Sequence, residues 1–73
     1  MTPPPPKVWP GLDGTGVGCR EKIRVLNENH AEVTQVLRDA FEDAVLMGVD
    51  EAAMRRILVD IVQGLDSPKR RAP

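Results

Sequence analysis

The sequence predicts an all-α fold, an αα-hairpin with a long helix over about residues 19–47 and a shorter helix over about residues 50–65. Apolar residues recur at alternating intervals of three and four along both segments, which is the helical pattern. The tripeptide Gly48-Val49-Asp50 between them combines a helix-ending Gly with a helix-starting Asp. Most of the seven Pro and six Gly residues lie in residues 1–18, which excludes regular structure there.

A chain of 73 residues with two aromatic side chains, Trp9 and Phe41, amounts to one small domain or less. Such short chains bury only about 60% of their unfolded surface. The single Cys excludes a disulfide scaffold, and no apolar run approaches the ~18 residues of a membrane span. This size argues against an enzyme with a deep pocket. We therefore expect a non-enzymatic protein with no cofactor, no metal and no membrane partner.

The charge is unevenly distributed although the net charge is only −1. Residues 18–67 carry six basic and ten acidic side chains, a balance of −4, whereas Lys69–Arg71 add three positive charges. An acidic body opposes the phosphate neutralisation that dominates nucleic-acid affinity. Residues 1–18 lack the basic and apolar regions of a secretory signal, and a lone Cys suits a reducing compartment. We therefore expect a cytoplasmic protein.

Residues 1–18 form a head in which Pro3–Pro6 predict polyproline II and the Gly-rich stretch 11–18 predicts a flexible linker. We expect this head to be disordered. Its Gly pattern lacks the Lys and the preceding strand of a phosphate-binding loop. Trp9 is costly to expose and is typical of an interface anchor. It would either fold back on the helices or insert into a partner.

The long helix carries an a/d heptad repeat held for about four heptads. Its members are Cys19, Ile23, Leu26, His30, Val33, Leu37, Ala40, Ala44 and Met47. A polar residue at an a position, here His30, is typical of a residue that fixes helix register. Asn29-His30-Ala31-Glu32 also has the form of a capping box. A break near residues 27–30, giving a three-helix bundle, is therefore the alternative; the unbroken register favours one helix.

The second helix is predicted from Asp50, an N-cap residue, to about Leu65. Its apolar stripe consists of Met54, Leu58, Ile61 and Leu65, spaced 4, 3 and 4. Ser67-Pro68 ends the helix, because Pro cannot continue the hydrogen-bond pattern. The helical hairpin domain thus spans residues 19–66, and residues 67–73 are expected to be a disordered basic tail.

A two-residue connection makes the two helices antiparallel neighbours. The shorter helix then covers only the half of the longer one near residues 33–47, which leaves Cys19, Ile23 and Leu26 bare. We expect the chain to form a homodimer, most simply a C₂ four-helix bundle. The predicted dimer seam consists of Cys19, Ile23, Leu26, His30, Val33 and Leu37.

The function indicated by these features is a small protein–protein interaction module, such as an accessory subunit, adaptor or small regulator. The candidate partner-binding residues are Trp9, Leu26, His30, Phe41 and Leu46. A metal or redox role for Cys19 and His30 is a more distant hypothesis, because the Glu-x-x-His pattern of di-iron bundles fails at Asn27.

The alternative function is a helix-turn-helix DNA-binding transcriptional regulator. Ala44-x-x-x-Gly48-Val49-Asp50, followed by Met54 and Ile57, matches the spacing of that motif. DNA would then contact Arg55, Arg56, Lys69, Arg70 and Arg71. Glu42, Asp43 and Glu51 would face the phosphates at the entry of the motif, and this negative charge argues against nucleic acid as a partner.

Overall fold

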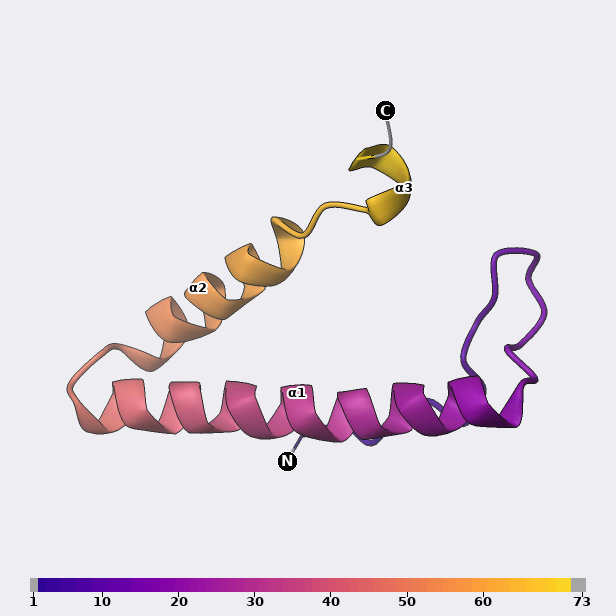
Figure 1. Ribbon diagram of the computed structural model, residues 1–73. Helices are drawn as coiled ribbons and strands as arrows, with labels where there is room; N and C mark the ends of the chain where they lie inside the picture. The colour runs from indigo at the N-terminus through magenta and orange to yellow at the C-terminus, as the bar shows by residue number, and fades with distance from the viewer. Residues whose placement is uncertain (1, 72–73) are drawn as a thin grey trace. The chain divides into compact units, whose positions relative to one another are not determined.

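The computed structural model describes residues 2–71, with the backbone alone at residues 70 and 71. It contains three helices, α1 (Arg20–Leu46), α2 (Glu51–Gln63) and the single turn α3 (Pro68–Arg71) (Figure 1). No strand occurs among these residues; Pro10 and Gly16 form one isolated antiparallel bridge. The prediction of an all-helical chain with two helices joined by a hairpin is confirmed.

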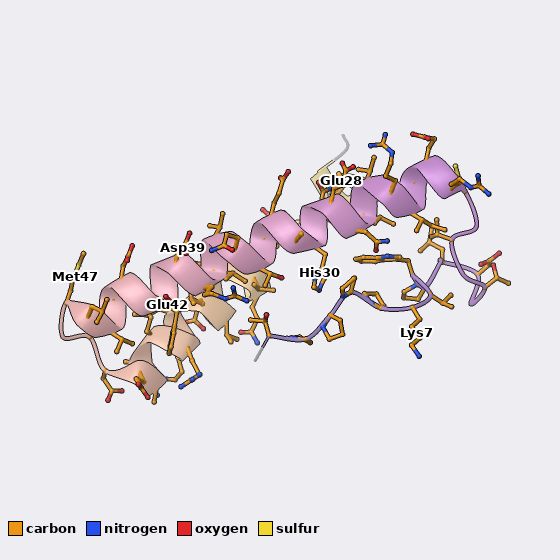
Figure 2. All side chains as sticks on the ribbon, turned by 90° about the horizontal axis from the view of Figure 1, so that it is seen from below. Lys7, Glu28, His30, Asp39, Glu42 and Met47 are labelled. Atoms are coloured by element: carbon orange, nitrogen blue, oxygen red, sulfur yellow. The ribbon has the colours of Figure 1, made fainter. Side chains whose placement is uncertain are left out.

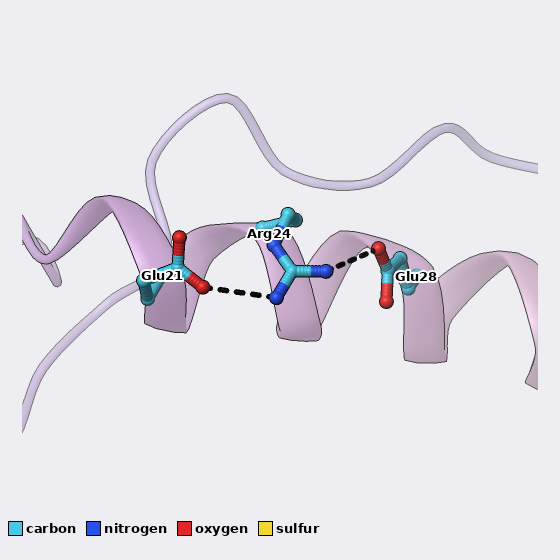
Figure 3. A network of polar contacts seen from close by, with 3 residues as sticks. All are labelled: Glu21, Arg24 and Glu28. Atoms are coloured by element: carbon cyan, nitrogen blue, oxygen red, sulfur yellow. Dashed lines mark hydrogen bonds and ion pairs between the residues drawn. The ribbon is translucent and has the colours of Figure 1, made fainter.

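Helix α1 is continuous through residues 27–30, so the alternative of a break and a third bundle helix there is wrong. Its first intrahelical hydrogen bond runs from the Ile23 amide to the Cys19 carbonyl, which makes Cys19 the N-cap residue. Arg24 then pairs with Glu21 and with Glu28, at 2.9 Å each (Figure 3). The hydrogen bond to Glu21, then the hydrogen bond to Glu28 and the charge of Glu28, raise the pKa of the guanidinium. These exposed i,i+3 and i,i+4 pairs support the first half of the helix.

The turn between α1 and α2 is a Schellman motif. The Gly48 amide donates to the Val45 carbonyl at 3.1 Å, and the Val49 amide donates to the Ala44 carbonyl at 2.9 Å. Gly48 has φ +100°, a conformation that residues with a Cβ rarely adopt. Asp50 follows as the N-cap of α2, where its Oδ2 accepts from the Ala53 amide at 2.9 Å. The predicted roles of Gly48 and Asp50 are confirmed.

Helix α2 ends two residues before the predicted Leu65, with Gly64 as its C-cap. The segment expected to be a disordered tail begins with the helical turn α3. Pro68 occupies the first helical position, where a backbone N–H would have no partner within the helix, so that its absence costs no hydrogen bond. Ser67 Oγ accepts from the Lys69 amide at 3.2 Å.

Most of the predicted heptad members of α1 are half-buried, namely Ile23, Leu26, His30, Leu37, Ala40 and Ala44, but the half-buried side departs from the heptad pattern at some positions. Thr34 is half-buried where the heptad pattern placed Val33, whose exposed fraction is 55%. Phe41 and Val45 are half-buried further on, whereas the heptad member Met47 is exposed. A straight α-helix drifts by about 20° per heptad from a 3.5-residue repeat, and this drift accounts for the difference.

The chain divides between Val36 and Leu37 into two compact units. The N-terminal unit combines the head with the first part of α1, and the C-terminal unit combines the rest of α1 with α2 and α3. Among the described residues, none is buried in either unit. The apolar stripes of both helices are therefore at most half covered by the chain itself.

Candidate functional site

Where we expected a disordered head, the structure has a closed loop over residues 9–17, drawn beside the start of α1 (Figure 1). The Val17 amide donates to the Trp9 carbonyl and the Gly11 amide donates to the Thr15 carbonyl, both at 2.7 Å. Asp13 Oδ1 accepts from the Thr15 amide at 3.0 Å and from its hydroxyl at 2.7 Å. These two bonds, the hydroxyl first, lower the pKa of the Asp13 carboxyl. Trp9 and Val17 are the residues at which the loop closes.

Trp9 docks on α1 through two contacts within the N-terminal unit. Its indole Nε1 donates a 2.9 Å hydrogen bond to Asn27 Oδ1. Its ring meets the His30 ring edge to face, with centroids 6.3 Å apart and planes at 75°. Figure 2 shows His30 on the face of α1 along which the head runs, while Lys7 points away from the helix. Of the two alternatives expected for Trp9, the structure shows it folded back on the chain.

Three of the candidate partner-binding residues thus lie in the N-terminal unit, and the structure brings Trp9 and His30 together. Trp9, Leu26 and His30 are all half-buried, and so is the seam residue Ile23. His30 Nδ1 also lies 3.5 Å from Thr34 Oγ1. The chain itself therefore covers part of the seam that we expected to be bare.

Cys19, the first member of the predicted seam, is exposed at the N-terminus of α1. The backbone N–H groups of Lys22 and then Glu21 are the main causes that lower the pKa of its thiol, and the Lys22 charge adds a smaller effect. This is the pattern expected of an N-cap side chain, which accepts from the second and third amides of its helix. The structure does not bring Cys19 and His30 together. Cys19 lies at the start of α1, and His30 lies eleven residues later, about three helical turns along the same helix.

Phe41, a fourth candidate, lies in the C-terminal unit against α2. The Arg55 guanidinium carbon sits 4.6 Å from the centroid of the Phe41 ring, a cation–π contact between the two helices of the hairpin. Phe41, Glu42, Val45 and Leu46 line a hollow of about 220 Å³ on α1. The fifth candidate, Leu46, is 86% exposed at its edge.

The residues proposed for DNA contact in the alternative function lie partly in this unit. Arg55 is engaged with Phe41, and Arg56 is exposed beside it on α2. Lys69 is exposed in α3. The side chains of Arg70 and Arg71 lie outside the described residues.

Sequence reasoning missed Asn27 and Val45. Asn27 was considered as part of a possible helix break and as the position where the di-iron pattern fails, whereas it is the acceptor for Trp9. Its place one turn before His30 is the signal that could have found it, because residues three apart share a helix face. Val45, which is not a member of the predicted heptad pattern, is half-buried and lines the hollow.

Within residues 2–71, no group of three or more His, Cys, Asp or Glu side chains could hold a metal ion. No helix in this part of the chain combines the length and the apolar character that a bilayer crossing requires. Comparison with protein family models, with curated protein sequences and with solved structures found no match. The surfaces that bear on function are therefore the one where Trp9 meets His30 and the hollow beside Phe41 and Leu46.

Proposed function

We propose that this chain is a small, non-enzymatic helical module for protein–protein interaction that acts by self-association. The observation that carries this proposal is the absence of any buried side chain among the described residues. The apolar surface that would form a core in an ordinary domain is left available to a partner.

The energetics favour the same conclusion. Ordering a residue costs about 1.5 kcal/mol of conformational entropy, and the burial of apolar surface must offset that cost. Thirteen large apolar side chains are exposed in the described part of the chain, so the burial of apolar surface is small for a sequence of this length. A second copy that covers these side chains supplies the missing burial, and two hairpins packed in this way make a four-helix bundle.

The proposed module would also bind a further protein through the side chains that the sequence singled out. Leu46 is the most exposed of them, and Phe41 lies with it along the same hollow. Trp9, Leu26 and His30 would act at the other end of α1, where the head lies on the helix. An accessory subunit, an adaptor or a small regulator would use its surface in this way.

The proposal is tested by the dependence of thermal stability on concentration. A self-associating chain gains stability by mass action, so its Tm rises as the chain concentration rises. We expect circular dichroism at 222 nm to show the Tm increasing over a hundredfold range of concentration starting near 1 μM. A Tm that stays constant over this range, with a cooperative transition, would contradict self-association.

A further inference from the structure

The head lies on the part of α1 that carries the first members of the predicted seam. Ile23, Leu26 and His30 are half-buried there, and Figure 2 shows His30 on the face along which the head runs. The Trp9 indole contacts Asn27 and His30, and spacings of three and four residues place both of them on one face with Ile23 and Leu26. All of these residues belong to the N-terminal unit, so the contact between the head and the seam is internal to that unit.

The head is built as one piece with a single connection to the helix. Residues 9–17 close through backbone hydrogen bonds, and Gly16 packs so closely on Val8 that a Cβ at Gly16 would collide with the Val8 side chain. Gly18 is the one residue between this closed loop and Cys19, the N-cap of α1. A Cβ added at Gly18 would meet no atom within 4 Å apart from its chain neighbours. Because glycine has wide backbone freedom, Gly18 is suited to act as the hinge about which the closed loop leaves the helix.

Trp9 makes two contacts that hold this loop on the helix. Its indole donates to Asn27, whose side chain is exposed, so that water competes for the same hydrogen bond. Its ring meets His30 edge to face. A net hydrogen bond or an aromatic contact of this kind favours the docked form by about two- to twelvefold. Contacts of this size keep the head on the helix and still allow a competing surface to displace it.

We propose that the head is an autoinhibitory strap on the N-terminal part of the seam. In the closed form it covers Ile23, Leu26 and His30, and in the open form it frees them for self-association. The inference rests on the proposed self-association and names its regulation. The occupant of this face in the single chain is the head itself, so a second copy reaches these three residues only by displacing Trp9.

The strap weakens self-association in proportion to the population of its closed form. A C₂ dimer uses the same face on both copies, so both copies must open. Loss of the Asn27 hydrogen bond raises a small open fraction by about two- to fivefold. The dissociation constant of the dimer should then fall by about four- to twenty-fivefold, because the open fraction enters once for each copy. Loss of the Trp9 indole removes both contacts and should lower the dissociation constant further.

Sedimentation equilibrium of variants of the whole chain tests the strap. We expect Asn27→Ala and Trp9→Ala to lower the dimer dissociation constant as just derived, with the helical signal at 222 nm retained. The matched controls are Asn29→Ala on the same helix and Leu12→Ala, which removes a head side chain that is 92% exposed. Both controls should change the dissociation constant by less than about twofold. An unchanged or raised dissociation constant in both Asn27→Ala and Trp9→Ala would overturn the strap and leave self-association standing.

The fluorescence of Trp9 tests the strap in the unaltered chain, where no substitution can disturb folding. Trp9 is the single Trp of the chain, so its emission reports where the head lies. We expect the emission to shift to the red as the concentration rises through the dimer dissociation constant, because association moves the indole from Asn27 and His30 into water. Emission that stays constant or shifts to the blue while the mass doubles would overturn the strap alone. A chain that stays monomeric both as the wild type and as Trp9→Ala would overturn the proposed self-association together with the strap.

Discussion

The indole Nε1 of Trp9 donates a 2.9 Å hydrogen bond to Oδ1 of Asn27, eighteen residues later in the chain. The same indole meets His30, one turn further along α1, edge to face. Because the loop of residues 9–17 closes on the Trp9 carbonyl, this one side chain links the head to the helix. The head therefore covers part of the apolar stripe of α1.

Replacing Asn27 with Ala should loosen the head. A net hydrogen bond of this kind contributes about 0.5–1 kcal/mol, which corresponds to a two- to fivefold change in the docking equilibrium. Trp9 is the single Trp of the chain, so its fluorescence reports on the head alone. We expect red-shifted emission and stronger acrylamide quenching in Asn27→Ala, and no change in the control Asn29→Ala. Identical quenching in both variants would show that the bond does not hold the head.

The Cys19 thiol should ionise at lower pH in the folded chain than in the unfolded chain. The amides of Lys22 and Glu21 lower its pKa, so the folded state favours the thiolate. The resulting stabilisation is present above the pKa of the unfolded thiol and is lost as the pH falls through the folded pKa. Iodoacetamide alkylation against pH should therefore have a lower midpoint in buffer than in urea.

Lys22→Gln provides the control for Cys19, because it removes the charge and keeps the amide. Since the charge is the smaller cause, the midpoint should move only slightly. A return to the midpoint of the unfolded chain would mean that the Lys22 charge, and not the helix end, lowers the pKa.

Gly48→Ala should destabilise the hairpin by about 1 kcal/mol, since an L residue at φ +100° is strained. The matched variant is Gly64→Ala, whose φ of −81° suits any residue. Urea unfolding followed by circular dichroism should show a clear loss of stability for Gly48→Ala and a much smaller change for Gly64→Ala. Equal effects would argue against the Schellman turn.

Arg55→Ala should reduce the free energy of unfolding by about 0.5–1 kcal/mol, the range for a cation–π contact at an exposed site. Arg56→Ala removes the same charge at the next position and should cost less.

The Arg55→Ala and Arg56→Ala substitutions together also test the alternative regulator function in a gel shift with duplex DNA at 0.15 M salt. We expect no retention by the wild type; salt-sensitive retention that is lost in the double variant would favour DNA binding.

The two long helices and the turn between them could be predicted from the sequence because local chemistry determines them. Gly48 and Asp50 act through hydrogen bonds within five residues, and the apolar spacing of α1 survives as a half-buried stripe. The exact stripe was less predictable: a 3.5-residue repeat selects Val33, whereas the straight helix half-buries Thr34.

The loop of the head was not predicted, because its closure depends on tertiary contacts. Alternating Gly residues are typical of a linker, yet Asp13 and Thr15 form a turn within them. Its place one turn before His30 puts Asn27 on the same helix face, but its role as acceptor follows only once Trp9 has folded back over eighteen residues.

The central claim is that the chain completes its apolar packing with a second copy. Its most direct test is the mass of the wild-type chain in solution, measured by sedimentation equilibrium at tens of micromolar with helicity monitored in the same buffer. The account predicts twice the chain mass of 8.0 kDa, with the helical signal intact. A mass of 8.0 kDa with full helicity at that concentration would contradict it.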